Sequence, residues 1–381
     1  MGGNVESKLK DLLASKFGKT IQARLNDIEE SIQKSEMDAF KRDFEKSEYH
    51  DKLVDICNSA FGPESECYNE LDFAFVSSEP LIELGVKNFD VLIYNEKIKH
   101  AIFVECKTST SDRGKYISDA YEAKKEVNEK KTYLENKLGD EIRTMEFVLC
   151  IPSENVESIV RELERREYKG EIDVASDDLL LIWQVNMFIG QTLQLFTRIN
   201  SRDKQYKSQH KDRTSKTANQ ICQKLTKMLG SGYKVKSEVL VKFYPSSHPL
   251  AIGSKIVVEI IGNNMRAEAS LKEFSINSVE QFCESPTNLA HYDSETIGKK
   301  ISDHFIGEGV ALGLVESIEG KEGWFRLKVE GKRLNTILNN YKERYKEAFV
   351  TRKTKEKAAK QVIEEHHKKY PDLSTYGEKW N

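Results

Sequence analysis

The sequence has little of what marks membrane or disordered proteins. Its 381 residues include no apolar run of about 18, the length that a helix needs to cross a bilayer, so we expect no membrane association. The polar N-terminus does not resemble a secretory signal. Prolines number only 7, and hydrophobic residues make up 38% of the chain beside 32% charged residues. This composition predicts packed cores rather than disorder.

The sequence also has no paired cysteines. Its 6 cysteines stand singly without a CxxC spacing, and its 8 histidines show no HExxH spacing. We therefore expect buried thiols in a reducing cytoplasm rather than a disulfide framework or a zinc knuckle, and the predicted location is cytoplasmic. The cysteines are Cys57, Cys67, Cys106, Cys150, Cys222 and Cys283.

Charge is divided unevenly between the two halves of the chain. The net charge is -3, but residues 1–200 hold 27 basic against 39 acidic side chains, whereas residues 201–381 hold 32 against 23. This division favours a basic second half that faces a polyanion. Two solvated surfaces with unequal counts are the alternative.

The first half alternates between helical and extended patterns. Apolar spacing predicts helix over 5–60, 115–138 and 156–167, and strands over 71–76, 89–94, 101–106, 146–151 and 171–174. The polar residues 95–97 predict a hairpin between the second and third strands. The expected fold class is α/β, with a mixed sheet flanked by helices.

The second half predicts a basic α+β domain. Residues 198–217 are polar and basic, which is typical of a linker or an arm. Beyond them we expect helices at 218–229, 295–305 and 334–370, strands at 233–243 and 254–261, and a hairpin pairing 310–318 with 323–329. Trp324 in this hairpin is expected to fill a core, and a wing-like hairpin that reads nucleic acid is the alternative. The predicted division is a domain over 1–197, a linker over 198–217 and a second domain over 218–381.

Three charged residues end the predicted hairpin strands. Asp90 begins one strand, and Glu105 and Lys107 end the next. Residues i and i+2 of a strand share a face, so Glu105 and Lys107 point together and Cys106 points away. If the hairpin is centred between Lys97 and Ile98, Asp90 faces Glu105 with Cβ atoms roughly 5 Å apart. Two carboxylates at that spacing suit a hard divalent cation. A surface hairpin that ends in an ion pair is the alternative.

This Asp-x14-Glu-x-Lys pattern resembles the PD-(D/E)xK nuclease superfamily over residues of about 40–175. Phe89 stands where the family name has proline, a position that does not ligate the metal. The resemblance implies a restriction-endonuclease-like fold in which Asp90, Glu105 and the backbone carbonyl of Cys106 bind Mg²⁺, which Mn²⁺ can replace. It implies that Lys107 orients or deprotonates the attacking water.

Many members of this superfamily also place an acidic residue on the preceding helix. Glu48 is the candidate here, with Glu45, Glu70 and Asp72 as rivals, and a solvated surface charge is the alternative reading of Glu48.

The expected activity is metal-dependent cleavage of double-stranded DNA by a restriction endonuclease, either sequence-specific or modification-dependent, that works as a homodimer. A structure-specific repair or junction nuclease is one alternative, and a non-catalytic nucleic-acid-binding module is another. Candidate phosphate contacts are Arg113, Lys115, Arg202, Lys204, Lys207, Lys211 and Arg213.

Overall fold

The computed structural model describes residues 2–15, 17–109, 112–171, 180–186, 191–196, 216–236, 241–267 and 270–369. Nearly all of the expected strand at 171–174 and of the linker at 198–217 lies outside these residues. Internal contacts divide the chain into two compact units. The sheet unit comprises residues 46–255 and 277–303, and the helical unit comprises 1–45, 256–276 and 304–381.

This division of the chain differs from the domain boundary expected at residues 198–217. Four helices supply residues to both units, so neither unit is one continuous stretch of sequence. They are α2 (Gly18–Ala60), α9 (Pro249–Arg266), α10 (Ile276–Glu284) and α11 (Ser294–Ala311).

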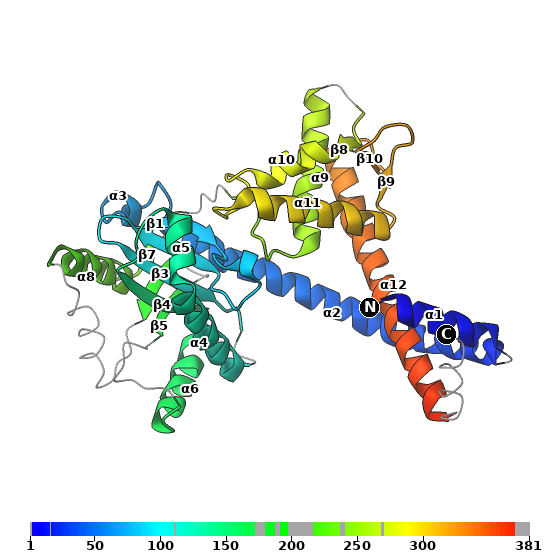
Figure 1. Ribbon diagram of the computed structural model, residues 1–381, viewed down its shortest axis with the longest axis horizontal. Helices are drawn as coiled ribbons and strands as arrows, with labels where there is room; N and C mark the ends of the chain where they lie inside the picture. The colour runs from blue at the N-terminus through cyan, green and yellow to red at the C-terminus, as the bar shows by residue number, and fades with distance from the viewer. Residues whose placement is uncertain are drawn as a thin grey trace. The chain divides into compact units, whose positions relative to one another are not determined.

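A mixed seven-stranded sheet forms the centre of the sheet unit (Figure 1). The strands follow the chain in order, and β3–β4 and β4–β5 pair in parallel while the other neighbours are antiparallel. The strands are β1 (Ala74–Ser78), β2 (Val91–Asn95), β3 (His100–Cys106), β4 (Thr144–Pro152), β5 (Leu181–Asn186), β6 (Thr192–Phe196) and β7 (Tyr233–Lys234). The α/β class expected from the sequence is therefore confirmed.

Helices cover both faces of this sheet because its central strands are apolar on both sides. The C-terminal part of α2, the short α3 (Glu66–Asn69) and α8 (Lys216–Gly230) pack on one face, where Trp183 stacks on Phe61. Helices α4 (Arg113–Glu129), α5 (Lys131–Leu138) and α6 (Val156–Tyr168) pack on the other. Alternation along β3 sends Phe103 to the α4 face and Val104 to the α2 face. The site described below lies at the end of this strand.

Helices and a small antiparallel sheet make up the helical unit. The sheet has the order β8–β10–β9, with β8 at Glu273–Ser275, β9 at Val315–Ser317 and β10 at Trp324–Leu327. Helix α1 (Gly2–Ala14) contacts the long α12 (Leu334–Lys369). The short α10 begins where β8 ends, and all of its residues after Ile276 belong to the sheet unit. The hairpin and the terminal helix were expected from the sequence.

Two expectations for the second half are wrong. Residues 254–261 form part of α9 rather than a strand, because the buried Ile256, Val257, Ile260 and Ile261 follow helical spacing. Trp324 is 41% exposed, so it does not fill a core. Alternation along β10 buries Leu327 instead.

Among the described residues, no helix is long and apolar enough to cross a membrane.

Candidate active site

The β2–β3 hairpin brings the ends of two strands together. Val91 pairs with Val104 and Asn95 with His100, which is the register expected from a turn centred between residues 97 and 98. Asp90 directly precedes β2, and Glu105 lies near the end of β3. The register therefore places Asp90 beside Glu105 at one edge of the sheet.

Asp90 is held by a backbone donor and a basic side chain. Its Oδ2 accepts a hydrogen bond from the Cys106 backbone N–H at 2.6 Å, and its Oδ1 lies 3.2 Å from His50 Nε2 of α2. Burial alone would raise the pKa of Asp90, but His50 and Lys107 lower it below its ordinary value. Asp90 is therefore ionised at neutral pH.

Glu105 and Lys107 form an ion pair on the same face of β3, as the strand alternation predicted. Lys107 Nζ contacts Glu105 Oε1, while Glu105 Oε2 is buried without a hydrogen-bond partner among the described residues. Burial and the nearby Asp90 carboxylate raise the pKa of Glu105 to about 8. A buried carboxylate oxygen without a donor is costly, so this atom marks a place where a cation would be favourable.

His50 and Glu79 complete the charged group, and sequence reasoning missed both. Burial alone would lower the pKa of His50, but the carboxylates of Asp90 and Asp51 raise it to about 10. Burial and Asp90 raise the pKa of Glu79 to about 7, and the Glu79 backbone N–H donates to the Asp90 carbonyl at 3.0 Å.

The balance of charge in this group is negative. Four carboxyl groups (Asp51, Glu79, Asp90 and Glu105) face two basic groups, His50 and Lys107. When all four carboxyl groups are ionised and both basic groups are protonated, the group has a net charge of two minus. Burial is the main cause of the raised pKa values of Glu79 and Glu105, and the nearby Asp90 carboxylate adds to it. A divalent cation would offset the negative charge of the ionised carboxylates.

Glu48, the expected helix carboxylate, is exposed on α2. The buried Leu53, Val54 and Cys57 follow His50 by three, four and seven residues, so they share its helix face. Glu48 precedes those residues by five, six and nine, which turns it to the other side of the helix. The helical spacing between His50 and the apolar residues Leu53, Val54 and Cys57 can be read from the sequence, and it would have predicted that His50 faces the sheet.

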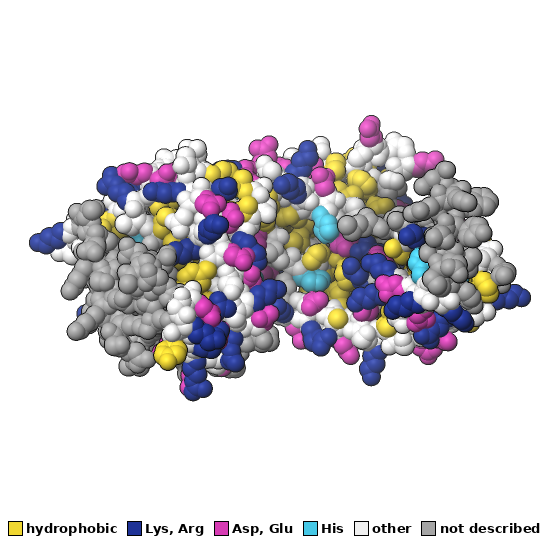
Figure 2. All heavy atoms as spheres, turned by 60° about the horizontal axis from the view of Figure 1, so that its bottom comes forward, with side chains coloured by type: hydrophobic (Ala, Val, Ile, Leu, Met, Phe, Trp, Pro, Cys, Tyr) yellow, Lys and Arg dark blue, Asp and Glu magenta, His cyan; other side chains and the backbone are white. Residues whose placement is uncertain are grey.

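The candidate phosphate contacts divide into two groups. Arg113 and Lys115 are exposed in the first turn of α4, which follows the Lys107 segment. The other five lie at 202–213, outside the described residues. On the surface in view in Figure 2, basic and acidic side chains are intermixed over the residues that are drawn in colour.

The donor set at Asp90 and Glu105 suits a hard cation. Both groups offer carboxylate oxygens, and the backbone N–H of Cys106, the residue whose carbonyl was expected as a further ligand, donates to Asp90. Among the described residues, three or more potential ligand atoms within 4.8 Å of one another occur at a different place, the thiols of Cys57, Cys106 and Cys150. Hydrogen bonds among the thiols lower the pKa in one direction and raise it in the other, and with burial added the pKa values of all three lie well above the ordinary range.

The chain is similar over most of its length to a protein of Archaeoglobus fulgidus. An "Uncharacterized protein" of Archaeoglobus fulgidus is 23% identical over 329 residues, which cover 81% of this chain and 83% of the relative. No protein-family model matches the chain. No solved structure matches it.

Proposed function

We propose that this protein is a metal-dependent endonuclease that hydrolyses phosphodiester bonds in double-stranded DNA at Asp90, Glu105 and Lys107. One observation supports this proposal above the others. Glu105 Oε2 is buried beside Asp90 and has no hydrogen-bond partner among the described residues, while Lys107 Nζ contacts the other oxygen of Glu105. An ordinary surface ion pair at a hairpin end would be exposed, whereas only 6% of the Glu105 side chain is exposed.

Asp90 and Glu105 are the residues that would hold Mg²⁺ or Mn²⁺. Their oxygen donors and the unmatched negative charge fit such an ion. When bound, the ion would lower the pKa of a coordinated water and offset negative charge on the phosphate. Two contacts fix the orientation of the Asp90 carboxylate. His50 holds Asp90 Oδ1, and the Cys106 N–H holds Asp90 Oδ2.

Lys107 is the residue that would meet the substrate. Its side chain is 22% exposed, and its Nζ lies 5.5 Å from the centre of the Tyr116 ring. Burial alone would lower the pKa of Lys107, but the Glu105 and Asp90 carboxylates raise it above the ordinary value, so Lys107 stays an ammonium group. As a cation it can stabilise negative charge that develops on a phosphate and orient the attacking water.

Restriction of DNA is the role that we propose for this activity, with a homodimer as the form that cuts both strands. Arg113 and Lys115 are exposed where a phosphate backbone could approach Lys107 from the α4 side.

Plasmid cleavage tests the proposal. Unmethylated and methylated plasmids are incubated with the protein in Mg²⁺, Mn²⁺ or EDTA, beside the Lys107→Ala variant and a Glu48→Gln control on the exposed side of α2. We expect discrete fragments that require the metal, persist in Glu48→Gln and disappear in Lys107→Ala.

The pattern of products also separates the alternatives. Cleavage of branched but not linear DNA would favour a structure-specific nuclease. A protein that binds DNA but cuts no substrate in either metal would contradict the nuclease proposal and favour a binding module.

A further inference from the structure

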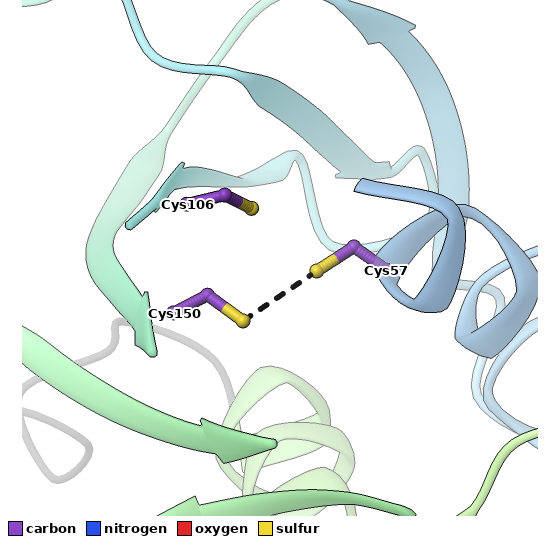
Figure 3. Close-up of side chains that lie close together, drawn as sticks. All are labelled: Cys57, Cys106 and Cys150. Carbon is purple, nitrogen blue, oxygen red and sulfur yellow. Dashed lines mark hydrogen bonds between the residues drawn. The ribbon is translucent and has the colours of Figure 1, made fainter. Parts of the chain in front are cut away.

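We infer that Cys57, Cys106 and Cys150 form a second metal site, which binds a soft, thiophilic ion through sulfur. The three residues come from α2, β3 and β4, and Figure 3 shows their side chains pointing toward one another. Their Sγ atoms all lie within 4.8 Å of one another. All three side chains are fully buried, and none of them forms a disulfide.

One sulfur–sulfur distance in the cluster is close to that of a metal site. Cys57 Sγ and Cys150 Sγ are 3.9 Å apart. With a metal–sulfur bond of about 2.3 Å, two ligands of a tetrahedral ion lie roughly 3.8 Å apart. Cys57 and Cys150 are therefore already spaced as two ligands of such an ion, and the Sγ atom of Cys106 lies within 4.8 Å of both.

Sulfur ligands and charge together select the class of ion. Thiolates favour Zn²⁺, Cd²⁺ or Cu⁺ over Mg²⁺ or Ca²⁺. Each thiol that binds transfers its proton to solvent as the metal–sulfur bond forms. Three thiolates leave a charge of one minus around a divalent ion and two minus around Cu⁺. Burial of charge is costly, so a divalent soft ion fits this apolar cluster better.

The three cysteines lie on the same helix and strands that carry the carboxylate site. Cys106 lies between Glu105 and Lys107, and its N–H holds Asp90. Cys57 follows His50 by two turns of α2 and lies on the same face. An ion at the three thiols would therefore tie together the helix and the strands that carry the carboxylate site. The inference does not depend on nuclease activity.

Cadmium titration of the full chain tests this inference. The protein is purified under reducing conditions, stripped of metal and titrated with Cd²⁺, and the thiolate-to-cadmium charge-transfer band is followed in the ultraviolet. Cys57→Ser is compared with Cys67→Ser, a matched control because Cys67 is also fully buried in the same apolar cluster but outside the three-thiol group. We expect one Cd²⁺ per chain in the wild type and in Cys67→Ser, and at least a 100-fold weaker affinity in Cys57→Ser.

A second measurement needs no variant. Elemental analysis of wild-type protein saturated with Zn²⁺ or with Cu⁺ and then desalted should show one Zn²⁺ per chain, retained in excess Mg²⁺. Retention of Cu⁺ alone would overturn the divalent assignment. Absence of the charge-transfer band in the wild type, or equal weakening in both serine variants, would overturn the site itself.

Discussion

Replacement of His50 by alanine should destabilise the sheet unit by uncovering the Asp90 carboxylate. His50 Nε2 lies 3.2 Å from Asp90 Oδ1, and the two side chains are 23% and 14% exposed. Loss of one partner from a buried ion pair costs about 3 to 5 kcal/mol, and the partial exposure of His50 points to the lower end. Alanine returns roughly 0.5 kcal/mol through its higher helix propensity. The expected net loss is about 2 to 3 kcal/mol.

The pH dependence of this loss has a defined sign. The pKa of His50 is raised from 6.5 to about 10 in the folded state, so its stabilising effect is complete below pH 6.5 and disappears as the pH rises toward 10. Urea denaturation of wild type and His50→Ala should therefore show a difference that narrows between neutral pH and about pH 10.

The matched control for this prediction is Glu48→Ala, two residues away on the exposed side of the same helix. It should change the free energy of unfolding by no more than about 0.5 kcal/mol. Equal losses in both variants, or a His50→Ala loss that does not narrow with rising pH, would refute the assignment of His50 as the partner of Asp90.

Two further predictions concern the sheet unit. Burial raises the pKa of Asp55 from 3.8 to about 6, so the folded state should lose stability as the pH rises from about 4 to about 6. Asp55→Asn should flatten the dependence of the urea midpoint on pH in that window, and an unchanged slope would count against the shift. Trp183 is 2% exposed and stacked on Phe61, so Trp183→Ala should cost about 3 to 5 kcal/mol in urea denaturation. Trp324→Ala should cost less than about 1 kcal/mol because that ring is 41% exposed, and the reverse order would contradict the two environments.

Local sequence patterns were sufficient to predict the hairpin that carries Asp90 and Glu105. The apolar strands on either side of residues 95–97 and the symmetry of the turn predict the observed register of β2 and β3. Two-residue alternation predicts that Glu105 and Lys107 share a face, as their ion pair shows. These features depend on residues that are close together in the sequence.

Contacts between distant segments were harder to predict. His50 reaches Asp90 across 40 residues, and no local pattern at Asp90 indicates its partner. The helix periodicity of α2 contained the missing signal, because His50 shares the face of Leu53 and Cys57. The meeting of Cys57 with Cys106 and Cys150 needs the packing of α2 against β3 and β4, which single cysteines in a sequence do not reveal.

The sequence was ambiguous where apolar runs were short. Residues 254–261 read as a strand, but tertiary packing buries them as a helix. A run of four to eight apolar residues is compatible with either structure.

The most direct test of the central claim is the rate of DNA cleavage by Glu105→Gln at saturating Mn²⁺. Glutamine keeps the size of the side chain and removes its charge, and the pKa of about 8 means that the fold already tolerates a neutral group at this position. Folding should therefore persist, while the cleavage rate should fall at least about 100-fold below the wild type. A folded Glu105→Gln variant that cuts DNA within a few-fold of the wild-type rate would contradict the claim that Glu105 belongs to a metal-dependent catalytic site.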